Sequence, residues 1–224
     1  MLLFPVPPDQ WGGEHDAKFF ARFQKAGKNL PIVQELEKGA EWEDLGDLTG
    51  GVSGQYHNEG GKGTARGERN SFFAKTLSGV HTLGGFQRVF RNTETGGVVA
   101  VVHIGSAAWG WPFVAHGGLL ATILDECLAI CGSLDEEQFV KTRKRAVTET
   151  LKIRYLQKVG WSPLKENFWV IRAESKRDRE DDRKMEKGSW SRCAKGTLET
   201  LDGVICVEAE GCYTASKELD ESLR

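Results

Sequence analysis

The most continuous hydrophobic segment of the chain covers residues 114–134. Leucine, isoleucine and alanine would lie on every side of the helix that it can form, and a helix that is apolar all round is normally buried. His116 stands just before the first turn of this helix, Gly117 and Gly118 open the turn, and Gly132 ends the run. The pattern therefore predicts one long buried helix that the rest of the chain must cover.

Shorter apolar segments on both sides of this helix predict β-strands. They cover residues 86–91, 98–104, 146–155, 168–174, 189–200 and 204–214. The first two should form a hairpin, and the continuous valines of the second suggest burial on both faces. The third strand alternates, which places Leu151 and Ile153 on one side and Thr148 on the other. The four strands after the helix, joined by short turns, predict an antiparallel meander that could cover the helix.

Residues 1–80 lie outside this pattern and predict a mainly helical extension. Phenylalanines recur at helical spacing within residues 11–26, which predicts a first helix. Pro31 is expected to open a second, short helix that ends at about Gly39. A further amphipathic turn is expected from three apolar residues, Trp42, Leu45 and Leu48.

Residues 50–67 are rich in glycine and polar side chains, which predicts a loop or linker. A loop that cradles phosphate is the alternative, but neither of the usual glycine patterns for such loops is present. We therefore expect three parts: a helical extension with its Gly-rich linker (residues 1–80), a domain of one helix and a sheet (81–216), and a polar tail (217–224).

Composition narrows the class of protein. The chain has 224 residues, of which 39% are hydrophobic, and a formal net charge of −2, so it can bury a core and has no basic excess for nucleic acid. No run reaches the ~18 apolar residues that a membrane span requires. Residues 1–5 are too short for a secretory signal, and early acidic residues argue against a transit peptide. We expect an intracellular protein, cytoplasmic, with a mitochondrial location as the alternative.

Several buried residues are expected to be structural. The cysteines are Cys127, Cys131, Cys193, Cys206 and Cys212. Their odd number, on apparent core elements, suits a reducing compartment. Cys127 and Cys131 lie one helical turn apart, which leaves metal or redox chemistry as the alternative, but no further ligands stand nearby in the sequence. Thr122 is expected to pack within the helix and bond a carbonyl one turn back, and His103 is expected to be a core or interface histidine.

Two adjacent carboxylates, Asp125 and Glu126, interrupt the apolar helix. Burying a carboxylate without a partner is unfavourable, so at least one of them should have a partner or a function. The free N–H groups at the start of the helix suit a carbonyl oxygen that becomes negative during acyl transfer. Asp125 follows His116 by nine positions, which is ~13 Å along the helix axis. It could reach only the helix start of a second, antiparallel copy, so a catalytic site would be shared between two subunits.

These residues carry a resemblance to a known family. The segment H-G-G-L-L-A-T-I-L-D-E at residues 116–126 and the strand V-T-E-T-L-K-I-R-Y at residues 147–155 resemble the hotdog-fold acyl-CoA thioesterases, over roughly residues 84–213. The resemblance implies an α+β hotdog fold, in which an antiparallel sheet wraps around one long central helix. It also implies hydrolysis of a fatty acyl-CoA by a homodimer or a dimer of dimers, with coenzyme A only as part of the substrate and no other cofactor or metal.

The resemblance further implies roles for residues of the helix. The backbone N–H of Gly117 or Gly118 would polarise the thioester carbonyl. His116 would shape the turn and bond the substrate, or would be a plain N-cap. Asp125 would be the base or the nucleophile, acting through water or through an anhydride, unless it is a helix carboxylate paired with a neighbour. Glu126 is the alternative carboxylate.

Other candidates lie outside the helix. Thr148 stands where members of that family have a hydroxyl that binds the water or the carboxylate, although a strand threonine is the simpler interpretation. The segment W-G-W-P-F at residues 109–113 departs from the family, and is either a packed loop or a wall of the acyl or pantetheine channel. Arg183 and Lys184 stand where the family places a basic pair that would bind the phosphates of coenzyme A. Further basic candidates are Lys152, Arg154 and Lys158.

Two other functions fit the same residues. A hotdog hydratase or dehydratase usually needs an Asp/Glu–His pair near the helix start, and no carboxylate follows His116 closely. A non-catalytic protein that binds acyl-CoA or serves as a scaffold could keep the fold, although the intact H-G-G motif and Asp125 speak for chemistry. A thioester-cleavage assay would separate the thioesterase from both of these functions; hydration of an enoyl-CoA would favour the hydratase, and binding without turnover would favour the non-catalytic protein.

Overall fold

The computed structural model describes residues 13–48, 77, 79–132, 147–160, 162, 167–176 and 190–215. Its elements are α1 (Gly13–Lys28), α2 (Pro31–Lys38), β1 (Trp42–Gly46), β2 (Gln87–Asn92), β3 (Val98–His103), the 3-10 helix η2 (Ser106–Ala108), β4 (Trp109–Trp111), β5 (Val114–Ala115), α4 (Gly117–Gly132), β6 (Val147–Tyr155), β7 (Phe168–Lys176), β8 (Trp190–Glu199) and β9 (Ile205–Ala215). The long helix and the strands predicted around it are present. The linker predicted at 50–67 and the tail predicted at 217–224 lie outside the described residues.

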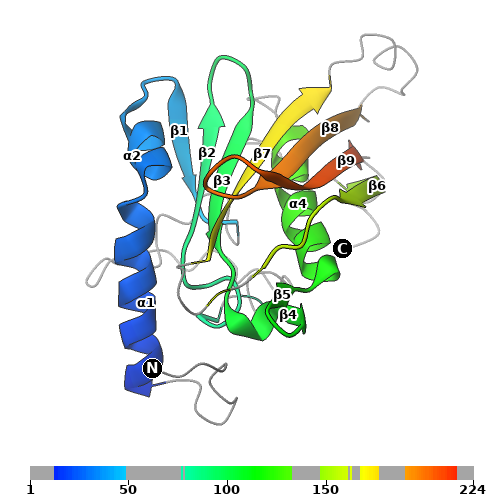
Figure 1. Ribbon diagram of the computed structural model, residues 1–224. Helices are drawn as coiled ribbons and strands as arrows, with labels where there is room; N and C mark the ends of the chain where they lie inside the picture. The colour runs from blue at the N-terminus through cyan, green and yellow to red at the C-terminus, as the bar shows by residue number, and fades with distance from the viewer. Residues whose placement is uncertain are drawn as a thin grey trace, which may run out of the picture.

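One antiparallel sheet holds the strands in the order β1-β2-β3-β7-β8-β9-β6. α4 lies against one face of this sheet (Figure 1), where its apolar side chains form the main core with inward-facing residues of the strands. The predicted α+β hotdog architecture is confirmed: an antiparallel sheet wraps around one long central helix, and helices precede it in the chain.

β3 is buried on both faces, as its run of valines predicts. Ala100 and Val102 belong to the core around α4, whereas Val99 and Val101 belong to a second apolar cluster on the opposite face, which includes Val33 of α2. The sheet therefore lies between α4 and the two N-terminal helices (Figure 1). The N-terminal helices therefore form a third layer, which covers the sheet at β2, β3 and β7.

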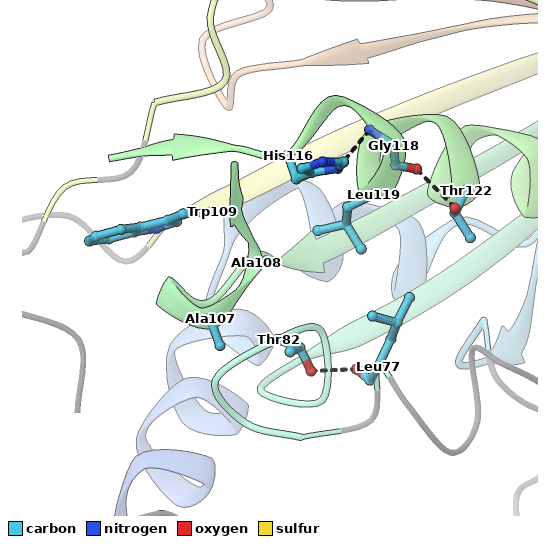
Figure 2. Close-up of a pocket in the computed structure, with 9 residues that line it drawn as sticks. All are labelled: Leu77, Thr82, Ala107, Ala108, Trp109, His116, Gly118, Leu119 and Thr122. Carbon is cyan, nitrogen blue, oxygen red and sulfur yellow. Dashed lines mark hydrogen bonds between the residues drawn. The ribbon is translucent and has the colours of Figure 1, made fainter. Parts of the chain in front are cut away.

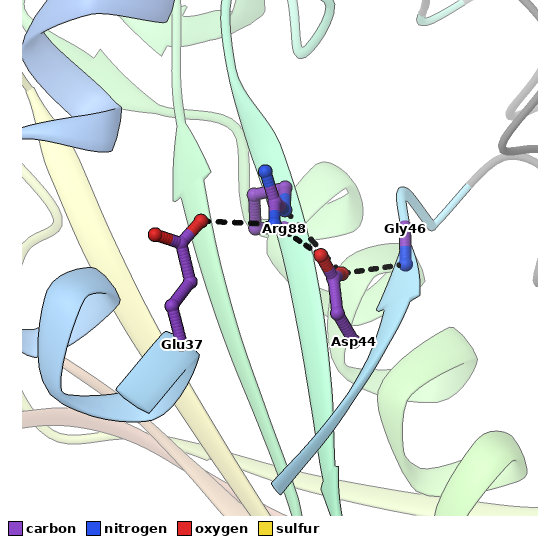
Figure 3. Close-up of polar contacts among 4 residues, drawn as sticks. All are labelled: Glu37, Asp44, Gly46 and Arg88. Carbon is purple, nitrogen blue, oxygen red and sulfur yellow. Dashed lines mark hydrogen bonds and ion pairs between the residues drawn. The ribbon is translucent and has the colours of Figure 1, made fainter. Parts of the chain in front are cut away.

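The extension also contributes a strand, because β1 pairs with β2 along the edge of the sheet. Arg88 of β2 forms ion pairs with Glu37 of α2 and with Asp44 of β1 (Figure 3), and Asp44 also accepts a hydrogen bond from the Gly46 N–H at 2.9 Å. The amphipathic turn predicted around Trp42 is therefore wrong. Pairing with β2 gives the backbone of these residues hydrogen-bond partners along one side of the strand, whereas a single helical turn leaves most of its terminal groups without partners.

The four strands after α4 do not form the predicted simple meander. β7, β8 and β9 are neighbours in chain order, but β6 pairs with β9 at the far edge, and β7 pairs with β3. β6 and β7 follow each other in the chain but are separated in the sheet by β8 and β9, so no hairpin joins them. This order puts β6 beside the helix at an edge of the sheet, where its residues can reach α4.

Two of the five cysteines form a disulfide, which the reducing compartment suggested by their odd number would not favour. Cys193 of β8 and Cys212 of β9 lie opposite each other in the sheet and are joined. Cys127, Cys131 and Cys206 are free and buried. Burial raises the pKa of Cys127 far above its usual range and that of Cys131 to about 12, so both remain thiols. The odd count could not reveal a pair that depends on the register of two strands.

Candidate active site

The start of α4 is organised by His116, the residue before the first helical position. Its Nδ1 accepts a hydrogen bond from the Gly118 N–H at 3.0 Å, and its carbonyl accepts one from the Leu120 N–H at 3.1 Å. His116 is thus an N-cap, as predicted. Because Nδ1 accepts, a neutral ring carries its proton on Nε2. Among the described residues neither the Gly117 N–H nor the Leu119 N–H has an acceptor, so Gly117 at the first helical position carries a free donor.

Asp125 lies farther along the same helix and is held by two hydroxyl groups. Thr148 Oγ1 donates to the two carboxylate oxygens, at 3.0 and 3.1 Å. The Tyr213 hydroxyl donates to Oδ1 at 3.0 Å and to the Asp125 carbonyl at 3.1 Å. Tyr213 is fully buried, and burial together with the nearby Asp125 raises the pKa of its phenol far above the usual range. Tyr213 therefore stays protonated and is a permanent donor to a carboxylate that remains half-exposed.

A β-bulge brings Thr148 to this carboxylate. Thr148 pairs with Tyr213 and Thr150 pairs with Cys212, so that one extra residue stands between them on β6. Leu151 and Ile153 pack against the core around α4, and strict alternation would have turned Thr148 to the opposite face. The extra residue reverses the alternation, as bulges do. Thr148 and Tyr213 consequently lie side by side on the face that meets α4.

Tyr213 is a site residue that the sequence interpretation missed. Its position in β9 follows the alternation that turns Val207, Ala209 and Tyr213 toward the core. A tyrosine on a buried face needs a partner for its hydroxyl. That requirement, combined with an unexplained carboxylate on the neighbouring helix, is the signal that could have identified the pair.

Tyr155, at the end of β6, is a second residue without a predicted role. Its hydroxyl donates to the Gly117 carbonyl at 2.8 Å. A Cβ at Gly117 would lie 3.3 Å from this hydroxyl, so glycine leaves the room for the contact. The ring therefore covers one side of the first turn of α4, next to the free Gly117 amide.

A cavity of about 450 Å³ runs along the first two turns of α4 (Figure 2). The described residues that line it are Leu77, Thr82, Ala107, Ala108, Trp109, His116, Gly118, Leu119 and Thr122. Thr122 Oγ1 bonds the Gly118 carbonyl at 2.9 Å, one turn back, as predicted. The channel-wall interpretation of residues 109–113 fits Trp109, whose ring packs on Phe113, whereas Trp111 is 77% exposed.

The remaining candidates are not gathered at this site. Glu126 is half-buried on α4, but the bonds from Thr148 and Tyr213 go to its neighbour. Lys152 and Arg154 are exposed, and Arg154 pairs with Glu208 at 3.2 Å. Arg183 and Lys184 lie outside the described residues. Among the residues that the structure describes, no three His, Cys, Asp or Glu side chains form a cluster that could hold a metal ion, and no helix is long and apolar enough to cross a membrane.

No protein-family model matches the chain. A curated relative is the uncharacterized mitochondrial membrane protein FMP10 of Saccharomyces cerevisiae, 26% identical over 114 residues. The match covers 50% of this chain, and the chain spans 38% of the length of that relative.

Several solved structures similar to this chain carry thioesterase names. One, described as a hypothetical thioesterase protein with coenzyme A from Streptococcus pneumoniae TIGR4, has 16% sequence identity and a TM-score of 0.40, covering 55% of this chain and 80% of its own. A protein from Streptococcus mutans UA159 bound to acetyl-CoA has the same identity and TM-score, covering 55% and 83%. A phenylacetic acid degradation-related protein from Ralstonia eutropha JMP134, named as a putative thioesterase, also has 16% identity and a TM-score of 0.40, covering 55% and 79%.

Proposed function

We propose that this protein is an acyl-CoA thioesterase, which hydrolyses a fatty acyl-CoA to the free acid and coenzyme A. The observation that carries the proposal is Asp125, a half-exposed carboxylate on an otherwise apolar helix, with two hydroxyl donors aimed at it. A carboxylate in an apolar setting destabilises the fold unless it is bonded, so its retention here calls for the partners that it has. The two donors fix the direction of the Asp125 carboxylate, as a base or nucleophile requires.

The chemistry follows from a carboxylate and a free amide. Asp125 removes a proton from a water whose oxygen adds to the thioester carbonyl carbon, or it attacks that carbon itself and water then hydrolyses the anhydride. The carbonyl oxygen becomes negative and is stabilised by the Gly117 N–H at the positive end of α4. The C–S bond then breaks, the thiolate of coenzyme A leaves and takes up a proton, and the acid is released.

The two parts of this site must come from two chains. Asp125 stands nine residues beyond His116, ~13 Å along one rigid helix, whereas a base must lie within hydrogen-bonding reach of the reacting group. A second copy with an antiparallel α4 would bring its Gly117 to Asp125 of the first. β6 is the edge strand of the described sheet and is largely exposed. We therefore propose a homodimer, in which a partner covers β6 and the exposed side of α4.

The proposal is tested by hydrolysis of saturated acyl-CoA, with the released thiol measured by a chromogenic reagent and no metal or nucleotide added. Asp125→Asn should lower kcat about 10²-fold or more, the lower end of what general-base catalysis supplies, while Glu126→Gln should cost far less. Folding should survive, because the amide is nearly isosteric with the acid. Hydration of enoyl-CoA without thioester cleavage, or binding without any turnover, would overturn the proposal. A large loss in Glu126→Gln alone would move the chemistry to that residue.

A further inference from the structure

We propose that Leu77 and the turn of residues 79–83, which precede the strand β2, form a wall of the acyl pocket, and that Leu77 sets the length of acyl chain that the protein accepts. This inference rests on the proposed thioesterase function and adds a substrate class to it. It also gives the N-terminal part of the chain a role in the site, beyond covering the far face of the sheet.

The cavity lies beside the start of α4, where the thioester is proposed to bind. It begins at His116 and Gly118 and follows α4 to Thr122. A thioester whose carbonyl oxygen meets the Gly117 N–H would therefore have this cavity directly beside its acyl carbon. Figure 2 shows Leu77 on the opposite side of the cavity from α4, with its side chain pointing toward Leu119. The gap between these two leucines is the space that a chain must enter.

The side chains that line the cavity suit an apolar ligand. Thr82 Oγ1 donates to the Leu77 carbonyl at 2.7 Å, and Thr122 Oγ1 donates to the Gly118 carbonyl at 2.9 Å. Both hydroxyl protons are thus used within the wall. Leucine and alanine side chains make up much of the rest of the described lining. A cavity of about 450 Å³ with this lining suits a hydrocarbon chain, since ligand pockets of ~300–1,000 Å³ bury most of an apolar ligand.

Hydrogen bonds fix the position of the turn, so that it can limit the length of the bound acyl chain. The Leu77 carbonyl also accepts the Leu83 N–H at 3.0 Å, and the turn is tied to the segment that leads to α4 by the Gly105 N–H to the Thr82 carbonyl at 2.6 Å. His81, in the same turn, bonds Asp16 of α1 at 2.8 Å. Leu77 is 9% exposed and belongs to the same core cluster as Leu119. A change in the size of Leu77 should therefore change the space available to the acyl chain.

The test compares Leu77→Ala, Leu77→Val and Leu77→Phe with the wild type on saturated straight-chain acyl-CoAs of increasing length. The ratio of kcat/KM for a long over a short chain should rise about ten-fold or more in Leu77→Ala and fall by a similar factor in Leu77→Phe, because one methylene in an apolar pocket changes discrimination by ~10–200-fold. Leu77→Val removes only one methylene and should shift the ratio in the same direction as Leu77→Ala. It therefore still tests the proposal if the alanine variant does not fold.

Leu36→Ala is the matched control, because Leu36 is 7% exposed but belongs to the cluster on the far side of the sheet. It should lower stability and leave the length profile unchanged. Binding of non-hydrolysable S-alkyl-CoA thioethers, measured by calorimetry, gives a readout that needs no turnover. If no variant hydrolyses acyl-CoA but the preferred alkyl length still shifts with residue 77, the thioesterase function is overturned and the role of Leu77 in the pocket wall is kept. Hydrolysis with one length profile in all folded Leu77 variants would overturn the wall alone, and neither hydrolysis nor binding would overturn both.

Discussion

Asp125 shows how a charge can be kept in an apolar helix. Its two donors come from strands that are far apart in the sequence, Thr148 from the edge strand β6 and Tyr213 from the buried strand β9. A hydrogen bond to a charged group contributes ~1.5–3 kcal/mol, so two such bonds offset much of the cost of partial burial. They also fix the direction of the carboxylate, which a proton acceptor requires.

We expect Tyr213→Phe and Thr148→Val each to lower kcat about ten-fold with little change in KM, because each removes one bond to Asp125 and leaves the shape of the site. Their effects should not multiply in the double variant, since both act on one carboxylate. Thr150→Val, one position beyond the bulge on the exposed face, is the control and should keep the wild-type kcat. Wild-type kcat in the double variant would show that the two hydroxyls do not position the base.

At the residue scale, the sequence predicts those contacts that depend only on residues close by in the chain. His116 as the N-cap, Thr122 bonded one turn back and His103 in the core all follow from local pattern and composition, and the structure confirms them. The contact between Thr148 and Asp125 depends on a bulge, which alternation cannot reveal. Tyr155 could not be placed over Gly117, because that contact requires the end of β6 to lie beside the start of α4.

Among the elements, α1 is attached to the sheet through one histidine. The Phe23 ring stacks on the His103 ring of β3 with centroids 3.8 Å apart, and Gln24 Nε2 donates to the Gly85 carbonyl at 3.0 Å. His103 is 1% exposed, and its Nδ1 has no partner among the described residues. Burial, and secondarily His81, lower the pKa of His103 from 6.5 to about 3. The contact between helix and sheet therefore requires the neutral ring.

Stability should consequently depend on pH below 6.5. Between pH 6.5 and about 3 the unfolded chain binds a proton at His103 that the folded protein does not. The free energy of unfolding should therefore fall as the pH falls through this window, by up to about 1.4 kcal/mol per pH unit, with no contribution from His103 to the slope above it. Urea unfolding at several pH values should show a shallower slope for His103→Leu. Val101→Ala, on the same strand, should lower stability without changing the slope. Parallel curves for His103→Leu and the wild type would contradict this assignment.

Some helices and strands are determined by the local sequence, and others by pairing with distant segments of the chain. α4 and the six strands around it could be predicted because hydrophobic periodicity is local. The strand β1 was mistaken for a helical turn, since its conformation comes from pairing with β2. The partner of β6 could not be predicted either, because β6 and β9 are not consecutive strands in the chain. The disulfide between Cys193 and Cys212 depends on the register of β8 against β9, which decides which residues lie opposite each other.

For the whole molecule, the distribution of exposed side chains indicates where a second copy would bind. The outer face of β7, β8 and β9 carries charges that pair with one another across the strands, as Lys176 with Glu210 at 2.9 Å and Lys195 with Glu174 at 3.5 Å. Such a face is stable in water and has little to gain from a partner. The edge strand β6 exposes apolar surface at both ends, because Val147 is 43% and Tyr155 54% exposed. This is also the side on which Asp125 is accessible.

We expect the protein to sediment as a dimer at working concentration, and two inactive variants to restore activity to each other. Asp125→Asn removes the carboxylate, and Gly117→Pro removes the free amide at the first helical position, where proline is tolerated. Each variant alone should lose about 10²-fold or more in rate. When equal amounts exchange subunits, half of the dimers are hybrids, and each hybrid has one site with both groups intact and one with neither. The mixture should therefore reach about one quarter of the wild-type rate.

The hybrid experiment separates a shared site from a site within one chain. If Asp125 worked with Gly117 of its own helix, every site in the mixture would carry a defect and the rate would stay at the mean of the two variants. Differently tagged chains that are purified through both tags confirm that hybrids have formed. A mixture of hybrids without recovered activity, or a fully active monomer in sedimentation, would contradict the dimer. Recovery to about one quarter would require Asp125 of one chain to act beside Gly117 of the other, because no site within a single mutant chain has both groups.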